Sequence, residues 1–174
     1  MLVLCLSIGV VATAYADGTV YTPYGVRYKN IAVKSYSSSY NDTWVSIIDK
    51  SRAAWNNSAA GTTITTSSSA NNQVLAAQYD DEWYGLFSRD TISQVYVTKF
   101  TIRANARTIS DAASNFNNFA RSTVVHEFGH AYFLEDEPPT TRASIMSYSR
   151  NRNTMTAPQS YDVENVIARY EMIP

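Results

Sequence analysis

The chain has 174 residues, a formal net charge of −1, and 45% hydrophobic and 17% charged residues. This length suits a single domain with its own hydrophobic core, and the composition is that of an ordinary globular protein. Because the sequence has no basic run and no acidic tail, neither a nucleic acid nor an anionic membrane is expected as a partner.

The start of the chain has the pattern of a signal peptide. Residues 2–14 are mostly apolar, but this span is too short to cross a bilayer as a helix. Small residues, Ala14 and Ala16, then stand at the positions that signal peptidase prefers. We therefore predict a signal peptide at residues 1–16, followed by a secreted, extracellular domain at residues 17–174. The alternative interpretation of the apolar segment is a buried first strand or helix.

The first half of the chain is expected to contain one helix among short strands. Alternation of β-branched or aromatic residues with polar ones indicates a strand at residues 26–36. Residues 41–58 place Trp44, Ile48 and Trp55 at helical spacing, so a helix is expected there. Three short strands are predicted next, at residues 62–68, 73–79 and 84–87.

The second half is expected to contain a longer strand and two helices. The strand is predicted at residues 94–104, with a bulge near Lys99 because the apolar residues change phase there. Helical period returns at residues 118–134, whereas residues 135–160 are polar and rich in proline, and are expected to be irregular. A last helix is predicted at residues 160–171.

Both histidines of the chain fall in the predicted helix at residues 118–134. His126 and His130 are four residues apart, so they share one face of the helix at about 6 Å separation and can bind one Zn²⁺. Glu127 is turned away by about 100° and can reach a water molecule in an open coordination position. This H-E-x-x-H pattern combines two metal ligands with a general base. The alternative is a chance match on a solvated or buried helix.

The flanking residues resemble those of the metzincin zinc peptidases. The segment HEFGHAYFLED, residues 126–136, is similar to the extended metzincin motif, and in snapalysin-like members its last position is an aspartate. The resemblance therefore implies that Asp136 is the third zinc ligand. Downstream, SIMSY at residues 144–148 is similar to the Met-turn of these enzymes. This implies that Met146 forms a hydrophobic floor below the ligands and that Tyr148 assists catalysis at the developing oxyanion.

The resemblance to matrixin- and snapalysin-like metzincins also implies a fold and a function. The expected fold class is α+β and metzincin/zincin-like: a twisted, mostly parallel sheet with an antiparallel edge strand, a backing helix, an active-site helix, and a small C-terminal subdomain with a last helix. The expected function is that of a secreted, monomeric zinc endopeptidase acting on protein or peptide substrates. His126, His130 and Asp136 would bind Zn²⁺, with Glu127 and Tyr148 as catalytic residues.

One departure from the metzincin pattern leaves alternatives open. Phe133 stands where the family has a glycine that ends the helix at positive φ, a conformation that costs another residue about 1–2 kcal/mol. If the helix ends differently, Glu135 or Glu137 would be the third ligand. A gluzincin-type peptidase would instead use a glutamate on a later helix, such as Glu164. A catalytically silent binding domain is the alternative from another functional class.

Other charged residues have weaker indications. Several carboxylates at residues 79–83, together with Asp90, are consistent with a structural Ca²⁺ site, although a solvated turn is the simpler interpretation. Arg150 and Arg152 follow the Met-turn-like segment, where metzincins shape the pocket for the substrate residue after the cut bond. They would either select polar or acidic side chains or face solvent.

Overall fold

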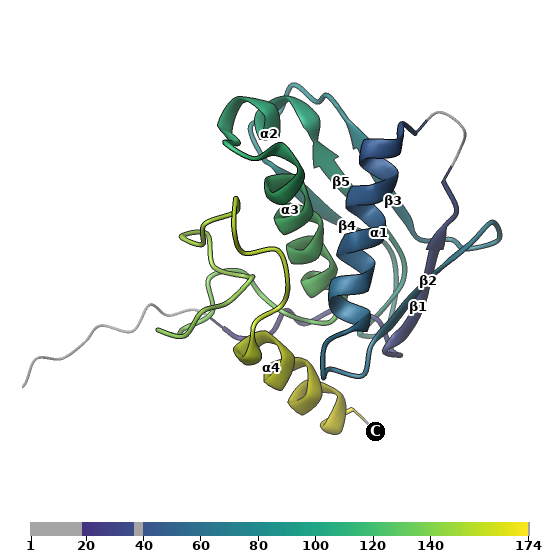
Figure 1. Cartoon of the computed structure of the whole chain (residues 1–174). Coiled ribbons are helices and arrows are strands. Elements are labelled where there is room, and N and C mark those ends of the chain that lie inside the picture. Colours follow the sequence, from purple (N-terminus) through teal and green to yellow (C-terminus); the bar gives the residue numbers. More distant parts are fainter. Residues whose placement is uncertain (1–18, 37–39, 174) are drawn as a thin grey trace, which may run out of the picture.

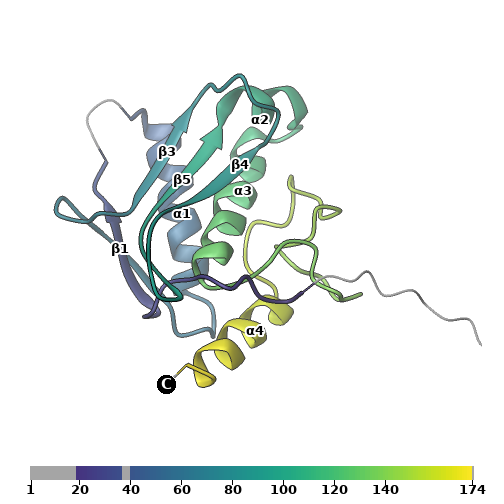
Figure 2. The same cartoon turned by 180° about the vertical axis from the view of Figure 1, so that it is seen from behind.

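The computed structural model describes residues 19–36 and 40–173 and has an α+β architecture. Helices α1 (Asp42–Asn56) and α3 (Phe116–Ala131) lie side by side across one face of the strands (Figure 1). The opposite view shows the strands in front of these two helices (Figure 2). The predicted signal peptide at residues 1–16 lies outside the described residues, so the structure does not bear on it.

Three of the helices begin at an asparagine whose side-chain oxygen accepts a backbone N–H from the first turn. These residues are Asn41 before α1, Asn105 before the short α2 (Ala106–Ala112), and Asn115 before α3. Such caps satisfy N–H groups that the helix itself leaves free. The last helix, α4 (Ser160–Glu171), lies where the sequence predicted it. The sequence did not predict α2, because seven residues are too few for a periodic signal.

The strands form two sheets. Strand β1 (Asn30–Lys34) pairs in parallel with β2 (Thr63–Ser67). In the second sheet, β5 (Tyr96–Asn105) is central, with β3 (Gln73–Ala77) parallel on one side and β4 (Gly85–Ser93) antiparallel on the other. Among the described residues, no strand pairs with the outer side of β4. It is therefore an edge strand, and it runs close to helix α3.

The predicted fold class is wrong in its sheet. One twisted, mostly parallel sheet of metzincin/zincin type with an antiparallel edge strand was expected. The structure instead has two small sheets, and β4 is the antiparallel edge strand of the larger one. In the described part of the chain they are joined by a single bridge, between Val33 and Asn72. The Asn72 side chain donates to Ala32 O at 3.0 Å and accepts from Phe100 N at 3.1 Å. The side chain thus occupies backbone hydrogen-bonding groups that an adjacent strand would pair with in a continuous sheet.

Other boundaries also shift from their predicted positions. The strand expected at residues 84–87 continues to Ser93 by pairing with β5. Its second half is exposed and has no apolar pattern, so the sequence did not reveal this extension. The bulge expected near Lys99 is confirmed: Thr98 has no partner, although Lys99 and Val97 pair with β4 on either side of it. Helix α3 ends three residues earlier than predicted, before a turn described below.

A buried aromatic cluster fixes α3 against α1. The Trp55 side chain of α1 is fully buried, and its Nε1 donates to Val125 O of α3 at 2.9 Å. Its ring centre lies 5.3 Å from that of Tyr132, just after α3. This packing gives the helix that carries both histidines a rigid support. In the described part of the chain, no helix is both long enough and apolar enough to span a membrane.

Candidate metal centre

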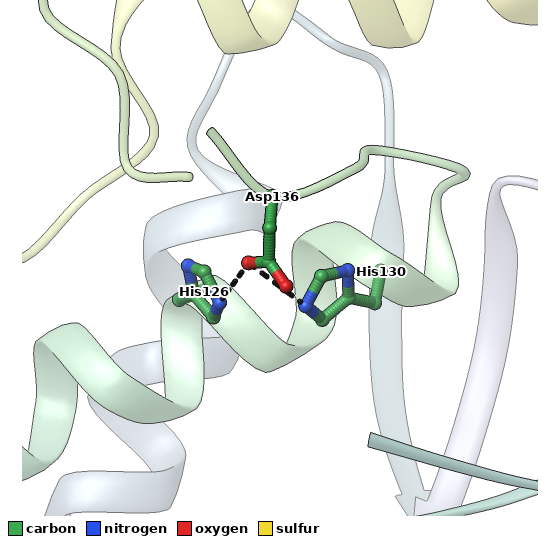
Figure 3. A group of neighbouring side chains, drawn as sticks. All are labelled: His126, His130 and Asp136. Carbon is green, nitrogen blue, oxygen red and sulfur yellow. Dashed lines mark ion pairs between the residues drawn. The ribbon is translucent and has the colours of Figure 1, made fainter. Parts of the chain in front are cut away.

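The structure brings together His126, His130 and Asp136. Both histidines are buried on α3, and the Asp136 carboxylate lies over them from the following loop (Figure 3). Asp136 Oδ1 is 3.0 Å from His126 Nε2 and 3.5 Å from His130 Nε2. One potential ligand atom from each residue lies within 4.8 Å of the others. Within the described residues this is the single cluster of three or more His, Cys, Asp or Glu side chains with such spacing.

The other ring nitrogen of each histidine is held by a backbone carbonyl. His126 Nδ1 is 3.0 Å from Ile145 O, and His130 Nδ1 is 2.9 Å from Leu134 O. Because a carbonyl oxygen only accepts, each Nδ1 must carry the hydrogen, which leaves the Nε2 lone pair facing the centre. Burial lowers the pKa of His126 to about 4, so its imidazole is neutral near pH 7. Both rings are thereby oriented as metal ligands usually are.

A tight turn at the end of α3 carries Asp136 back over the helix. Phe133 has φ of +69°, its N–H donates to His130 O at 3.2 Å, and the next N–H, of Leu134, donates to Gly129 O at 3.0 Å. This pair of bonds around one left-handed residue is the Schellman motif. Phe133 therefore adopts the left-handed conformation for which metzincins use glycine, and Asp136 lies over the histidines, as the resemblance implied.

Packing explains why a phenylalanine occupies this left-handed position. The Phe133 ring is fully buried, and a Cβ added to Gly25 would lie only 2.5 Å from it. The Arg169 guanidinium lies 4.5 Å from the ring centre, and the Tyr170 ring is 5.9 Å away. Burying the ring stabilises the fold by about 1.5–3 kcal/mol, which offsets the backbone strain. The only sign of this contact in the sequence is Gly25, and a single glycine does not identify its packing partner.

The donor set fits a zinc ion. Burial works against ionisation of Asp136, but its contacts with the two histidine side chains hold the pKa of this carboxyl at about 2, so it is ionised near neutral pH. Its Oδ1 is nevertheless buried without a hydrogen-bond donor. Such an unsatisfied carboxylate oxygen is costly, and a cation between it and the two imidazoles would remove that cost. Two neutral imidazoles and one carboxylate are an ordinary ligand set for catalytic zinc.

Glu127 lies beside this centre in a pocket closed by β4. Its side chain is buried, and a Cβ added to Gly85 at the start of β4 would collide with Glu127 Oε1. Burial, followed by the negative charge of Asp136, raises the pKa of Glu127 to about 8. The sequence did not single out Gly85, because only the long-range contact between β4 and α3 reveals why a side chain cannot stand there.

The segment similar to a Met-turn, residues 144–148, packs against helix α3. Met146 is buried, and a Cβ added to Gly129 would lie 2.5 Å from its sulfur. The preceding Ile145 supplies the carbonyl that orients His126. This turn is tied to α4 by Asp162, whose carboxylate accepts from Ile145 N at 2.8 Å. The turn is therefore part of the support of the cluster.

Tyr148 lies at the open side of the cluster. Its side chain is 54% exposed, and its ring centre is 6.3 Å from that of His126. Partial burial, followed by the influence of the nearby Asp136 carboxylate, raises the pKa of Tyr148, so the phenol stays protonated near neutral pH. Its backbone N–H donates to Glu137 Oε1. This tyrosine is thus close enough to the cluster to donate a hydrogen bond there.

The alternative third ligands are engaged elsewhere. Glu135 Oε1 accepts from Asp136 N at 3.1 Å, and Glu137 accepts from the backbone of Tyr148. Glu164 makes two bonds of 2.7 Å with Arg142 on the exposed side of α4. None of the three belongs to the His-His-Asp cluster of the described residues.

The loop considered for calcium holds an arginine instead. The Arg107 guanidinium donates to the backbone oxygens of Tyr79, Asp80 and Asp81 and to Glu82 Oε1, over 2.8–3.1 Å. Asp90, the other candidate, accepts from Thr101 at 2.6 Å. A cation is therefore already present in the loop, supplied by the chain itself.

A cavity of about 460 Å³ opens beside the cluster. Glu127 and Tyr148 line it together with the clustered residues, and the start of β4 forms one side. Both Arg150 and Arg152 line this cavity. The sequence had allowed two alternatives for them, a substrate pocket or the solvent. The arrangement thus places a metal-binding cluster, a carboxylate and a hydroxyl around one space large enough for part of a peptide.

Comparisons with known proteins inform the fold and not the site. No protein-family model matches the chain, and no curated protein matches it. Among solved structures, it is similar to a chain of the structure described as "GM1 bound form of the ECX AB5 holotoxin". The TM-score is 0.57 at 12% identity, over 88% of this chain and 86% of that chain. At this identity the likeness concerns the fold alone, and the metzincin/zincin-like fold class expected from the sequence is replaced by the α+β arrangement of two small sheets.

Proposed function

We propose that this protein is a zinc-dependent endopeptidase. One observation carries the proposal: the buried Asp136 Oδ1, which lacks a hydrogen-bond donor, lies between the Nε2 atoms of His126 and His130. Both nitrogens are free to bind a metal because the opposite ring nitrogens are held by backbone carbonyls. The similarity of residues 126–148 to the metzincin motifs also supports this function. This similarity is confined to those motifs and does not extend to the fold.

The residues around the cluster supply the groups that peptide hydrolysis needs. A bound zinc ion would supply Lewis-acid chemistry, polarising the scissile carbonyl and favouring ionisation of water. The positive charge of a bound metal would favour the ionised form of Glu127, which then acts as the proton acceptor: it takes the proton of the attacking water and returns it to the nitrogen of the leaving amine. The Tyr148 hydroxyl donates a hydrogen bond to the oxygen on which negative charge develops.

The edge strand β4 offers a place for an extended substrate. Gly85 and Leu86 line the cavity, and Leu86 is exposed. A peptide that adds to a free sheet edge gains backbone hydrogen bonds without a requirement for particular side chains. A substrate placed along β4 would run past Glu127, because Gly85 is in contact with its carboxylate. We infer a protein or peptide substrate. From the signal-peptide pattern at residues 1–16 we infer that the enzyme is secreted, and we expect it to act as a monomer.

The test compares the wild-type protein with Glu127→Gln. The amide keeps the size of the side chain but cannot accept the proton, so we expect cleavage of casein to fall by about 10²–10⁴-fold while zinc remains bound. Glu164→Gln is the matched control, because Glu164 pairs with Arg142 on the exposed side of α4. It should keep full activity.

Two outcomes would contradict the proposal. If Glu127→Gln cleaves casein at the wild-type rate, the carboxylate does not act as the base. If the zinc-loaded wild-type protein cleaves no peptide, the alternative of a catalytically silent binding domain holds. A chelator control, with activity restored by added zinc, separates metal-dependent cleavage from contamination by another peptidase.

A further inference from the structure

Arg150 is held in a fixed position in the wall of the cavity. Its side chain is only 8% exposed; Nε donates to Ser122 Oγ at 3.2 Å, and Nη1 donates to Ser147 O at 2.8 Å. These two bonds fix the plane of the guanidinium, which still lines the cavity. The group is therefore preorganised to donate its remaining N–H groups to a ligand there.

Arg152 presents a second guanidinium to the same cavity. Its Nη1 donates to Tyr148 O at 3.0 Å, and the group lies over two rings, 5.2 Å from the centre of Tyr84 and 5.8 Å from that of Phe119. Stacking on aromatic rings limits the conformations of an arginine, so less entropy is lost when it binds a ligand.

These two positive charges have no carboxylate partner of their own. Within residues 19–36 and 40–173, no Asp or Glu forms an ion pair with Arg150 or Arg152. Burial, followed by the charge of Arg152, lowers the pKa of Arg150 to about 9. The charges of Glu127, Asp136 and Asp162 act on Arg150 in the opposite direction, but none of these carboxylates is hydrogen-bonded to it. Asp136 faces the histidines, and Glu127 lies against β4. A ligand with a negative group would thus relieve the repulsion between the two guanidinium groups.

We propose that Arg150 and Arg152 select substrates that carry a carboxylate beside the peptide bond to be cut. This inference rests on the proposed endopeptidase function and names its substrate class. The two oxygens of a carboxylate match the geometry of guanidinium N–H groups, and bonds between two charged groups are stronger than those to an amide. An amide of the same size would leave buried donors less well paired, which is how a polar site rejects a near-isosteric substrate.

The first measurement uses pairs of fluorogenic peptides that differ in one group. Asp is compared with Asn, and Glu with Gln, at each position next to the cut bond, with blocked ends. A second set compares a free C-terminal carboxylate with a C-terminal amide, which separates a side-chain source of the carboxylate from a chain terminus. We expect kcat/KM to be about 10- to 100-fold higher for the carboxylate member of at least one pair.

Variants then assign the preference to the arginines. In Arg152→Gln, the ratio of kcat/KM between the Asp and Asn peptides should fall towards one. Arg150→Gln should do the same if circular dichroism shows that it folds, and Arg152→Gln decides if it does not. Arg142→Gln is the matched control, because Arg142 is exposed and paired with Glu164, so this variant should keep the wild-type ratio.

A binding measurement keeps the inference testable apart from turnover. Isothermal titration of the Glu127→Gln protein with the blocked Asp and Asn peptides should give tighter binding of the Asp peptide, and Arg152→Gln should abolish the difference. Equal kcat/KM and equal affinity within each pair would overturn the inference but leave the endopeptidase function standing. An Asp preference in binding without cleavage of any peptide would instead overturn the proposed function.

Discussion

Asp136 is the residue on which the cluster depends, because it is the one member that does not come from helix α3. Asp136→Ala removes one of the three proposed ligands and leaves two imidazoles, so we expect zinc affinity to fall by at least about 100-fold. Competition with a chelating dye measures this affinity. Glu135→Ala and Glu137→Ala serve as neighbouring controls and should bind zinc as the wild type does. Full affinity in Asp136→Ala, with loss in either control, would assign the ligand to a glutamate.

Phe133 combines a strained backbone with a buried ring, and two substitutions separate these effects. Removing the ring costs about 3–5 kcal/mol, whereas glycine relieves about 1–2 kcal/mol of strain at positive φ. We therefore expect Phe133→Gly to be destabilised by about 2 kcal/mol, and Phe133→Ala, which keeps the strain, by about 1–2 kcal/mol more. Urea unfolding of both variants measures the difference. An alanine variant as stable as the glycine variant would show that φ at position 133 carries no strain.

At the scale of elements, the contact between the 144–148 turn and helix α4 supports the cluster through one carboxylate. Asp162 at the start of α4 accepts from Ser144 Oγ at 2.5 Å, from Ile145 N at 2.8 Å and from Gln159 N at 2.7 Å. Asp162→Ala would leave these donors unpaired, so we expect a loss of about 3 kcal/mol in unfolding free energy. An asparagine can keep all three bonds, because its amide group donates to the Ser144 hydroxyl and its oxygen accepts the two backbone N–H groups.

Ionisation of Asp162 adds a pH dependence that distinguishes these variants. Burial raises the pKa of Asp162 above its ordinary value of 3.8, although its hydrogen bonds act in the opposite direction. The contribution of this group to stability is therefore full below pH 3.8 and declines as the pH rises above it. Asp162→Asn lacks this decline, so its stability relative to wild type should improve as the pH is raised from 3.5 towards neutral. A relative stability that is independent of pH would contradict this assignment.

At the scale of the whole molecule, the metal and the fold should stabilise each other. The cluster joins α3 to the loop that follows it, and Glu135 N in this loop donates to Val20 O of the N-terminal segment. Zinc that binds only the folded state raises stability by about 2.7 kcal/mol at a hundredfold excess over Kd. We expect chelation to lower the thermal unfolding temperature and added zinc to restore it. Asp136→Ala should show no such shift; a shift of the same size in that variant would place the stabilising metal elsewhere.

Predictions from the sequence were reliable where the signal was local. Helical spacing placed His126 and His130 on one face, because the geometry of a helix repeats over a few residues. The position of Asp136 near them followed from the resemblance to the metzincin motif, which left the two neighbouring glutamates as alternatives. Predictions failed where distant segments meet. The division of the strands into two sheets depends on Asn72, whose side chain bonds to strands β1 and β5, far from it in the chain.

The sequence by itself determined the chemical identity of the cluster: two histidines four residues apart, a glutamate between them and a carboxylate within reach. Only the tertiary structure decided that Asp136, and neither neighbouring glutamate, faces the histidines, and that Phe133 tolerates a left-handed backbone by packing on Gly25. It also decided that Arg150 and Arg152 line the cavity. Side-chain spacing within a helix follows from backbone geometry alone, whereas cavities and sheet edges form from contacts between segments that no local pattern encodes.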